Sequence, residues 1–346
     1  AARMGAVTGK GLSDLIREEF GFRATFFAMT VLGIADFGNI LAEFSGLSLG
    51  MSLFNVAAWI AVPIGALLIW LLVVRGRYRK VELVLVGLSL IYFTYAFSAA
   101  LARPQWTVAL REMVLPTGVS FHGEYLVLVI GLIGTTITPW MQFYLQASIV
   151  EKGIGVKEYA MSRWDVISGC FITEIVSFFI IVACAATLYV HGLHDVDNIA
   201  DVALALRPLA GRYAALLFAI GLINAALLSA AILPLATAYN VCEGLGFESG
   251  VDKRFSEAPA FYGLYTLLIA AGAGLVLIPR LPLVKVILYS QVANGVLLPF
   301  VLWYMLRLIN REEVMGEHRN GVLANGIAWA TSVAIMILTV LWVFTL

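Results

Sequence analysis

The chain contains few charged residues for its length. Only 13% of its 346 residues are Asp, Glu, Lys or Arg, whereas 61% are hydrophobic. A soluble domain carries about 25% charged residues, which cover its surface in water. The scarcity of charge therefore excludes a soluble fold, and the high hydrophobicity excludes a disordered chain. The composition predicts an all-α polytopic membrane protein surrounded by the lipid bilayer.

The charges that are present cancel. The 22 basic and 22 acidic residues give a net charge of zero, so no polybasic surface is available for nucleic acid. Nucleic acid is therefore excluded as a partner, and no motif indicates a required protein partner. The first residues contain neither an initiator methionine nor an apolar signal segment, so we expect the start to be internal.

Cysteine and histidine are also scarce. We interpret the three cysteines as buried small hydrophobic residues, because they lie in or beside apolar stretches and form no CxxC pair. No HExxH motif or nucleophile–base pair occurs at membrane depth, so we expect neither an enzyme nor a bound cofactor. His191 and His194 lie near Asp195 and Asp197. Their spacing is loose for a metal site, so we favour a solvated polar loop over that alternative.

Long apolar runs separated by polar breaks predict nine membrane spans. The predicted spans are 24–46, 53–74, 81–101, 124–149, 164–190, 213–240, 259–279, 283–307 and 322–345. The preceding segment 9–19 is too charged to span, and we predict an amphipathic helix on the membrane surface there.

The basic residues are distributed unevenly between the predicted loops. Sixteen of the 22 Lys and Arg residues precede the first span or follow the second, fourth, sixth or eighth. Five lie in the loops on the other side, and Lys285 lies within a span. The positive-inside rule predicts that the sixteen-charge side is cytoplasmic. We expect an integral protein of the plasma (inner) membrane.

The predicted span 124–149 contains a sequence that weakens a helix. Gly131 and Gly134 precede three threonines and Pro139, which lacks a backbone donor and clashes with the preceding turn. Carbonyl groups freed at membrane depth are tolerated only where protein or a water-filled cavity satisfies them. Discontinuous helices of this kind form ion sites in transporters. The alternative is a simple proline kink with threonine hydroxyls bonded to the preceding turn.

The first predicted span carries Asp36, Asn39 and Glu43. The spacing i, i+3 and i+7 predicts that the three side chains share one helix face. Acidic side chains are costly within a membrane, and they mark a transport pathway or a buried pair.

Other polar residues lie within later spans. Glu174 and Lys285 are candidates for a structural ion pair, although the sequence cannot establish contact. Gln291 and Asn294 place two amides on one helix face. We interpret Asn224 as a residue that joins two helices by a hydrogen bond.

Several ordered segments resemble the NRAMP (natural resistance-associated macrophage protein) family of divalent-metal transporters. They cover nearly the whole chain: residues 5–19, LAEF at 41–44, LARP at 101–104, GLIG through Pro139 at 131–139, RWDVI at 163–167 and SQV at 290–292. The resemblance implies a LeuT-like inverted-repeat transporter fold with discontinuous helices and about nine spans present.

The resemblance also implies how the chain is divided. Residues 1–346 would form one transporter domain. Its first part, 1–23, would be the end of a preceding helix and a cytoplasmic loop, and 24–123 would be the remainder of the first repeat. The second repeat would be 124–307, and 322–345 would be an extra helix. The family's first helix carries a DPGN motif whose Asp and Asn bind the metal, and this chain starts after it. Asp36 to Asn39 read DFGN, but they precede the LAEF signature of the third helix and do not correspond to that motif.

Three departures from the family pattern point to the cargo. Thr138 replaces a methionine ligand, Trp140 replaces a histidine and Ile40 replaces an aspartate of the proton route. Oxygen ligands suit Mg²⁺, whereas soft sulfur favours transition metals. The chain is therefore most like the NRAMP-related magnesium transporters, and we expect uptake of Mg²⁺, and also Mn²⁺, by alternating access without proton coupling.

The candidate metal ligands are the Thr135 carbonyl, the Thr138 hydroxyl and the Gln291 amide oxygen. Candidates for lining the cavity or pathway are Asn294, Glu43, Asn39, Asp36, Trp140, Asn224 and Glu174. The alternative is a proton-coupled Mn²⁺/Fe²⁺ symporter in which Asp36 or Glu174 replaces the lost proton carriers. A transporter of amino acids is a further alternative, because helix ends at a break also bind carboxylates.

Overall fold

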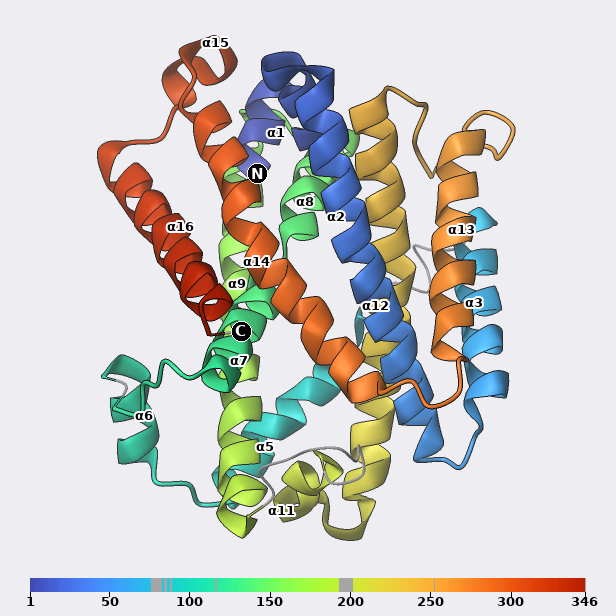
Figure 1. Cartoon of the computed structure of the whole chain (residues 1–346), viewed down its shortest axis with the longest axis vertical. Helices are drawn as coiled ribbons and strands as arrows, with labels where there is room; N and C mark the ends of the chain where they lie inside the picture. Colours follow the sequence, from blue (N-terminus) through green and yellow to red (C-terminus); the bar gives the residue numbers. More distant parts are fainter. Residues whose placement is uncertain are drawn as a thin grey trace.

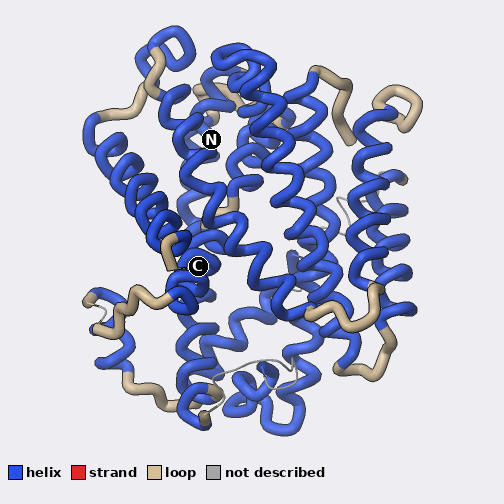
Figure 2. The backbone as a smooth tube through the Cα atoms, viewed as in Figure 1, coloured by secondary structure: helices blue, strands red, loops and turns tan. Residues whose placement is uncertain are grey.

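The computed structural model consists almost entirely of helices (Figure 2). It describes residues 1–75, 83, 86–87, 89–115, 117–192, 202–251 and 253–345, and no strand occurs among them. The basic residues at 77–80 and the potential ligands His194, Asp195 and Asp197 lie outside the described residues.

The chain begins with two helices that differ from the expected surface helix. Helix α1 (Ala2–Thr8) ends at Gly9, whose φ of 63° is left-handed, and α2 (Leu12–Ser52) follows. Gly21 interrupts α2 with φ 82° and ψ 168°, a backbone conformation open to glycine. The turns before Gly21 are not on the surface as predicted, because Leu12 and Ile16 are fully buried against residues of α1, α8 and α14.

The remaining elements follow in chain order. They are α3 (Ala58–Val74), η1 (Ser89–Phe93), α5 (Thr94–Leu101), α6 (Trp106–Val114), α7 (Gly123–Thr136), α8 (Pro139–Glu151), α9 (Tyr159–Thr187), η2 (Tyr189–His191), η3 (Ala203–Leu206), α11 (Arg207–Ala210), η4 (Gly211–Tyr213), α12 (Ala214–Leu245), α13 (Pro259–Val276), α14 (Leu283–Ile309), α15 (Glu312–Met315), η5 (Gly316–His318) and α16 (Val322–Val343).

The helices agree with the predicted spans. Within the described residues, seven of the nine predicted spans correspond to segments long and apolar enough to cross a membrane, counting α7 and α8 together. The second and third spans correspond to the shorter apolar helices Ala58–Val74 and Ser89–Leu101. Within the third span, residues 81, 82, 84, 85 and 88 lie outside the described part of the chain.

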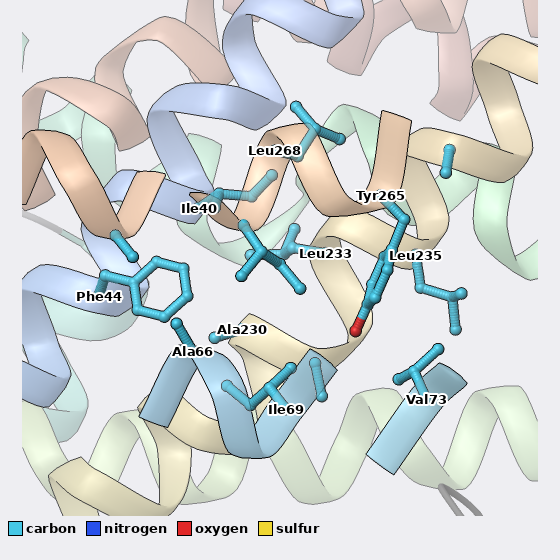
Figure 3. Close-up of a cluster of buried hydrophobic side chains, with 14 of the residues drawn as sticks. Ile40, Phe44, Ala66, Ile69, Val73, Ala230, Leu233, Leu235, Tyr265 and Leu268 are labelled. Atoms are coloured by element: carbon cyan, nitrogen blue, oxygen red, sulfur yellow. The ribbon is translucent and has the colours of Figure 1, made fainter. Parts of the chain in front are cut away.

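Helices α2, α12 and α14 lie at the centre of the molecule, with α3 and α13 on one side and α16 on the other (Figure 1). The largest buried cluster joins α2, α3, α12 and α13 through residues such as Phe44, Ile69, Leu233 and Tyr265 (Figure 3). Helices α9 and α16 bury few of their apolar side chains, which is expected of helices that face lipid. Eleven of the fifteen buried polar residues in the described part of the chain lie on the central helices α2, α12 and α14.

Candidate metal site at the broken helix

The predicted break divides one span into α7 and α8. Helix α7 ends at Thr136, and the next two residues leave helical geometry, with ψ of 75° at Ile137 and 137° at Thr138. Pro139 begins α8 and has no N–H, so the carbonyl of Thr135 lacks its usual donor four residues ahead. Thr136 bonds the Leu132 carbonyl at 2.8 Å, as the kink alternative predicts, yet the helix is interrupted.

Glycines hold α14 against the last turns of α7. A Cβ on Gly134 would overlap the backbone carbonyl of Gln291 and the backbone of Gly295. A Cβ on Gly295 would in turn overlap the carbonyl of Ile130. Small residues allow helix backbones to approach closely within a membrane. This crossing places Gln291 beside the turn of α7 that precedes the break.

Three amides form a network between α14 and α2. Asn294 Nδ2 donates to Asn39 Oδ1 at 2.7 Å, and Asn39 Nδ2 donates to Asn294 Oδ1 at 3.1 Å. Gln291 Nε2 donates to Asn39 Oδ1 at 3.4 Å, and Gln291 Oε1 accepts from Asn294 Nδ2 at 3.3 Å. Asn39 and Asn294 are buried, whereas Gln291 is half-buried. The two buried amides therefore orient the more accessible one.

Thr138 leaves a buried polar atom unused. Its side chain is 5% exposed, and its Oγ1 has no hydrogen-bond partner among the described residues. Thr138 is also the N-cap residue of α8, but its hydroxyl makes no capping bond. Buried polar atoms are nearly always paired, so an unpaired hydroxyl at a helix break is suited to an ion or a water molecule. Thr135 is exposed at the same break.

Asp36 does not join the amides on α14. Its side chain is fully buried, and Oδ2 lies within hydrogen-bond distance, 3.0 Å, of the Thr237 hydroxyl of α12. Oδ1 has no partner among the described residues. The spacing predicts that Asp36 and Asn39 share one helix face, and in the structure the two side chains contact different neighbouring helices.

Glu43 and Asn224 belong to a third region, beside η1. Glu43 is half-buried and interacts electrostatically with Tyr92 of η1. Asn224 is 3% exposed and its Nδ2 donates to Ser89 Oγ at 3.3 Å. The Asn224 contact joins α12 to η1, which fits the predicted helix-joining role.

The other predicted residues lie away from the break or fill space beside it. Trp140 is half-buried between two apolar clusters, with its ring 6.1 Å from that of Tyr144. Glu174 and Lys285 are both exposed, and no ion pair joins them in the described part of the chain. The suggested structural pair is therefore wrong, because the two side chains point outward from α9 and α14.

Sequence reasoning missed two buried polar contacts. It did not consider Thr237, whose partner Asp36 lies 201 residues earlier. It assigned no role to Gln146, whose fully buried side chain donates from Nε2 to the Lys10 carbonyl at 2.9 Å. A polar residue in an apolar run was the signal available in both cases.

Comparison with known proteins places the chain in a family. The sequence profile of the natural resistance-associated macrophage protein-like (Nramp) family matches residues 1–345. The chain belongs to the Nramp family. The resemblance stated above is thereby confirmed, and Nramp proteins are membrane transporters without a cofactor rather than enzymes.

Individual relatives and solved structures agree with this placement. The divalent metal cation transporter MntH of Ralstonia nicotianae is 29% identical over 348 residues, covering 95% of this chain and 76% of the relative. MntH of Klebsiella pneumoniae is 28% identical, covering 95% and 78%. A manganese transporter of Eremococcus coleocola, solved with an aromatic bis-isothiourea substituted compound, has a TM-score of 0.74 at 21% identity, covering 98% and 75%. The predicted LeuT-like fold of this Nramp chain is confirmed.

Proposed function

We propose that this Nramp protein transports divalent metal ions across the membrane, with Mn²⁺ as its principal cargo. The observation that carries the proposal is the unpaired, buried Thr138 hydroxyl at the break between α7 and α8. The Thr135 carbonyl, which Pro139 leaves without its helical donor, and Gln291 flank the same break. Membership of the Nramp family supports a transported ion rather than a resident one.

The three oxygens suit a metal ion for electrostatic reasons. The C-terminal end of a helix carries a partial negative charge, so the end of α7 favours a cation. Asn39 and Asn294 hold the Gln291 amide and leave its Oε1 with a single long hydrogen bond of 3.3 Å. That oxygen therefore has a lone pair available for the ion. The three ligands are neutral.

The cargo is inferred from the relatives and tested against the ligands. The relatives above are named for divalent metal cations and for manganese, which fits the manganese alternative better than the magnesium expectation. Mg²⁺ is a second candidate, because the proposed ligands are all oxygen atoms and Thr138 stands where the family has a methionine.

Metal uptake into liposomes that contain the purified protein tests the proposal. We expect the wild type to take up Mn²⁺. In Thr138→Met we expect Cd²⁺ to compete more strongly with Mn²⁺ uptake, and Mg²⁺ to compete less strongly, because sulfur is a soft ligand. Thr136→Met is the matched control, because Thr136 is exposed and its hydroxyl bonds within α7. Absence of uptake contradicts the proposed function. Equal shifts in the two variants contradict the placement of Thr138 at the ion.

The proposal extends to the arrangement of the chain in the membrane. We infer that 24–123 and 124–307 are the two inverted repeats, that the sixteen-charge side is cytoplasmic and that the protein lies in the plasma membrane. Labelling of single cysteines tests the orientation. A membrane-impermeant reagent should label intact cells at Arg103→Cys and only permeabilised cells at Lys157→Cys. Labelling of Lys157→Cys in intact cells contradicts the orientation.

A further inference from the structure

The carboxyl group of Asp36 is the most completely buried acid in the described interior of the membrane domain. Its side chain is 0% exposed and lies between α2 and α12. Only one of its two oxygens has a hydrogen-bond partner among the described residues. An ionised carboxylate at this depth is costly unless a cation or several donors compensate for lost water.

The Thr237 hydroxyl makes two contacts with only one proton. Its Oγ1 lies 3.0 Å from Asp36 Oδ2 and 2.9 Å from the Leu233 carbonyl oxygen. The Leu233 oxygen accepts only, and a hydroxyl donates once. Two separate two-centre hydrogen bonds at these positions require Asp36 to carry a proton and to donate it to Thr237. If Asp36 is ionised, Thr237 must turn its proton from Leu233 to the carboxylate.

No Lys, Arg or His in the described part of the chain forms an ion pair with Asp36. Thr237 is the only described residue with a hydrogen bond to this carboxyl. The nearest ionisable residues along the packed helices are Glu43 on α2, Tyr239 on α12, Tyr265 on α13 and Tyr289 on α14, and none of the four is a cation. The hydrogen-bond geometry and the absence of a neighbouring cation among the described residues both favour a protonated Asp36 carboxyl in this conformation.

The position of Asp36 connects it to the proposed metal site and to a groove. Asn39, one turn along α2, is bonded to the amides that orient Gln291. Thr237 borders a groove of about 330 Å³ between α2, α12 and α13, which is also lined by Thr30 and Gly33. A movement of α2 therefore changes the surroundings of the carboxyl and of the amides together.

We propose that Asp36 is a proton-binding site whose loading and release accompany metal transport. The proposal rests on the proposed function. In the present conformation Asp36 Oδ2–H donates to Thr237, which donates to Leu233. When α2 moves relative to α12 and water reaches the pair, the Asp36 O–H bond breaks and water accepts the proton. The Thr237 O–H then donates to the Asp36 carboxylate. Reprotonation of Asp36 from the opposite side of the membrane restores the first arrangement.

Infrared spectroscopy of the intact wild-type protein tests the proton directly. The expected spectrum contains the carbonyl band of a neutral carboxylic acid, which Asp36→Asn removes. Thr237→Val, which retains Asp36 but removes its partner, should shift the frequency of that band. Glu124→Gln is the matched control, because Glu124 is an exposed acid at the start of α7. A band that is absent, or that persists in Asp36→Asn, overturns the proposal.

Liposomes that report both metal and internal pH test the link to transport. Wild-type uptake of Mn²⁺ should acidify the interior, and Asp36→Asn should take up Mn²⁺ with acidification reduced to the level of protein-free liposomes. Metal uptake by the wild type without acidification overturns the inference but leaves the proposed function standing. Failure of the wild type to take up any metal contradicts the proposed function, and the infrared band then still decides whether Asp36 binds a proton.

Discussion

Helix α2 makes two polar contacts one turn apart, and they differ in chemistry. Asn39 contacts α14 through amides that donate to and accept from each other. Asp36 contacts α12 through one oxygen, and its other oxygen has no hydrogen-bond partner among the described residues. Amides do not change charge with pH, whereas a carboxyl does. The same helix is therefore attached to one neighbour by a fixed contact and to the other by a contact that depends on a proton.

The difference indicates that the two contacts of α2 have separate roles. The contact with α14 holds Gln291, a proposed metal ligand, in place whatever the pH, because Asn39 and Asn294 satisfy each other. The contact with α12 is free to respond to protons without a change in the ligand amide itself. Substitutions that remove one contact at a time separate the two roles.

The largest effect is expected from crowding the α7–α14 crossing, on which the fixed contact depends. A Cβ at Gly295 would overlap the Ile130 carbonyl and its side chain, and a backbone atom cannot move aside easily. We expect Gly295→Ala to destabilise the protein by about 3 kcal/mol, at the upper end for overpacking, and to abolish metal uptake. Thermal unfolding in detergent and liposome uptake measure the two effects.

The matched control for this substitution is Gly274→Ala. Gly274 lies in α13, and a Cβ there meets no atom within 4 Å. The control should retain stability and uptake, because alanine also has the higher helix propensity. Equal losses in the two variants would contradict the close crossing.

A smaller effect is expected from removing one amide of the fixed contact. Asn294→Leu leaves Asn39 Nδ2 without its partner and Asn39 Oδ1 with only the 3.4 Å bond from Gln291 Nε2. We expect a loss of about 1–2 kcal/mol in unfolding free energy, because a buried unpaired amide remains. The double variant Asn39→Leu/Asn294→Leu should recover part of that loss. A double variant that is as unstable as the sum of the single variants contradicts the direct contact.

The two contacts should also differ in their response to pH. The coupling energy between Asn39 and Asn294 should be equal in mildly acidic and mildly alkaline buffer, because amides do not titrate. Wild type should lose stability relative to Asp36→Asn as pH rises, because unfolding releases the proton that the folded protein is proposed to hold. Parallel pH profiles of wild type and Asp36→Asn contradict this expectation. Thermal unfolding across pH provides the measurement.

The sequence predicts those features that depend on neighbouring residues. Pro139 and its flanking glycines and threonines predict the break, because their backbone effects are local. The spacing of Gln291 and Asn294 predicts a shared face of one helix. The partner of Asn294 is Asn39, 255 residues away, and no local pattern specifies that pairing. The crossing of α2 and α14 determines it.

The failed expectations have the same origin. Residues 12–20 look amphipathic, but the surrounding helices cover their apolar side, so they are packed inside rather than on the surface. Glu174 and Lys285 have opposite charges within spans, yet their helices turn both side chains outward. The rotation of each helix about its axis depends on packing against distant segments, which a single sequence does not reveal.

The smallest effect is expected at Glu174, the other acid suggested as a proton carrier. Glu174 is exposed on α9, a helix that buries few of its apolar residues, whereas Asp36 is fully buried beside the amide network. We expect Glu174→Gln to retain both Mn²⁺ uptake and the accompanying acidification, because no described partner of Glu174 connects it to the broken helix. Loss of acidification in Glu174→Gln but not in Asp36→Asn would reverse the assignment of the proton site.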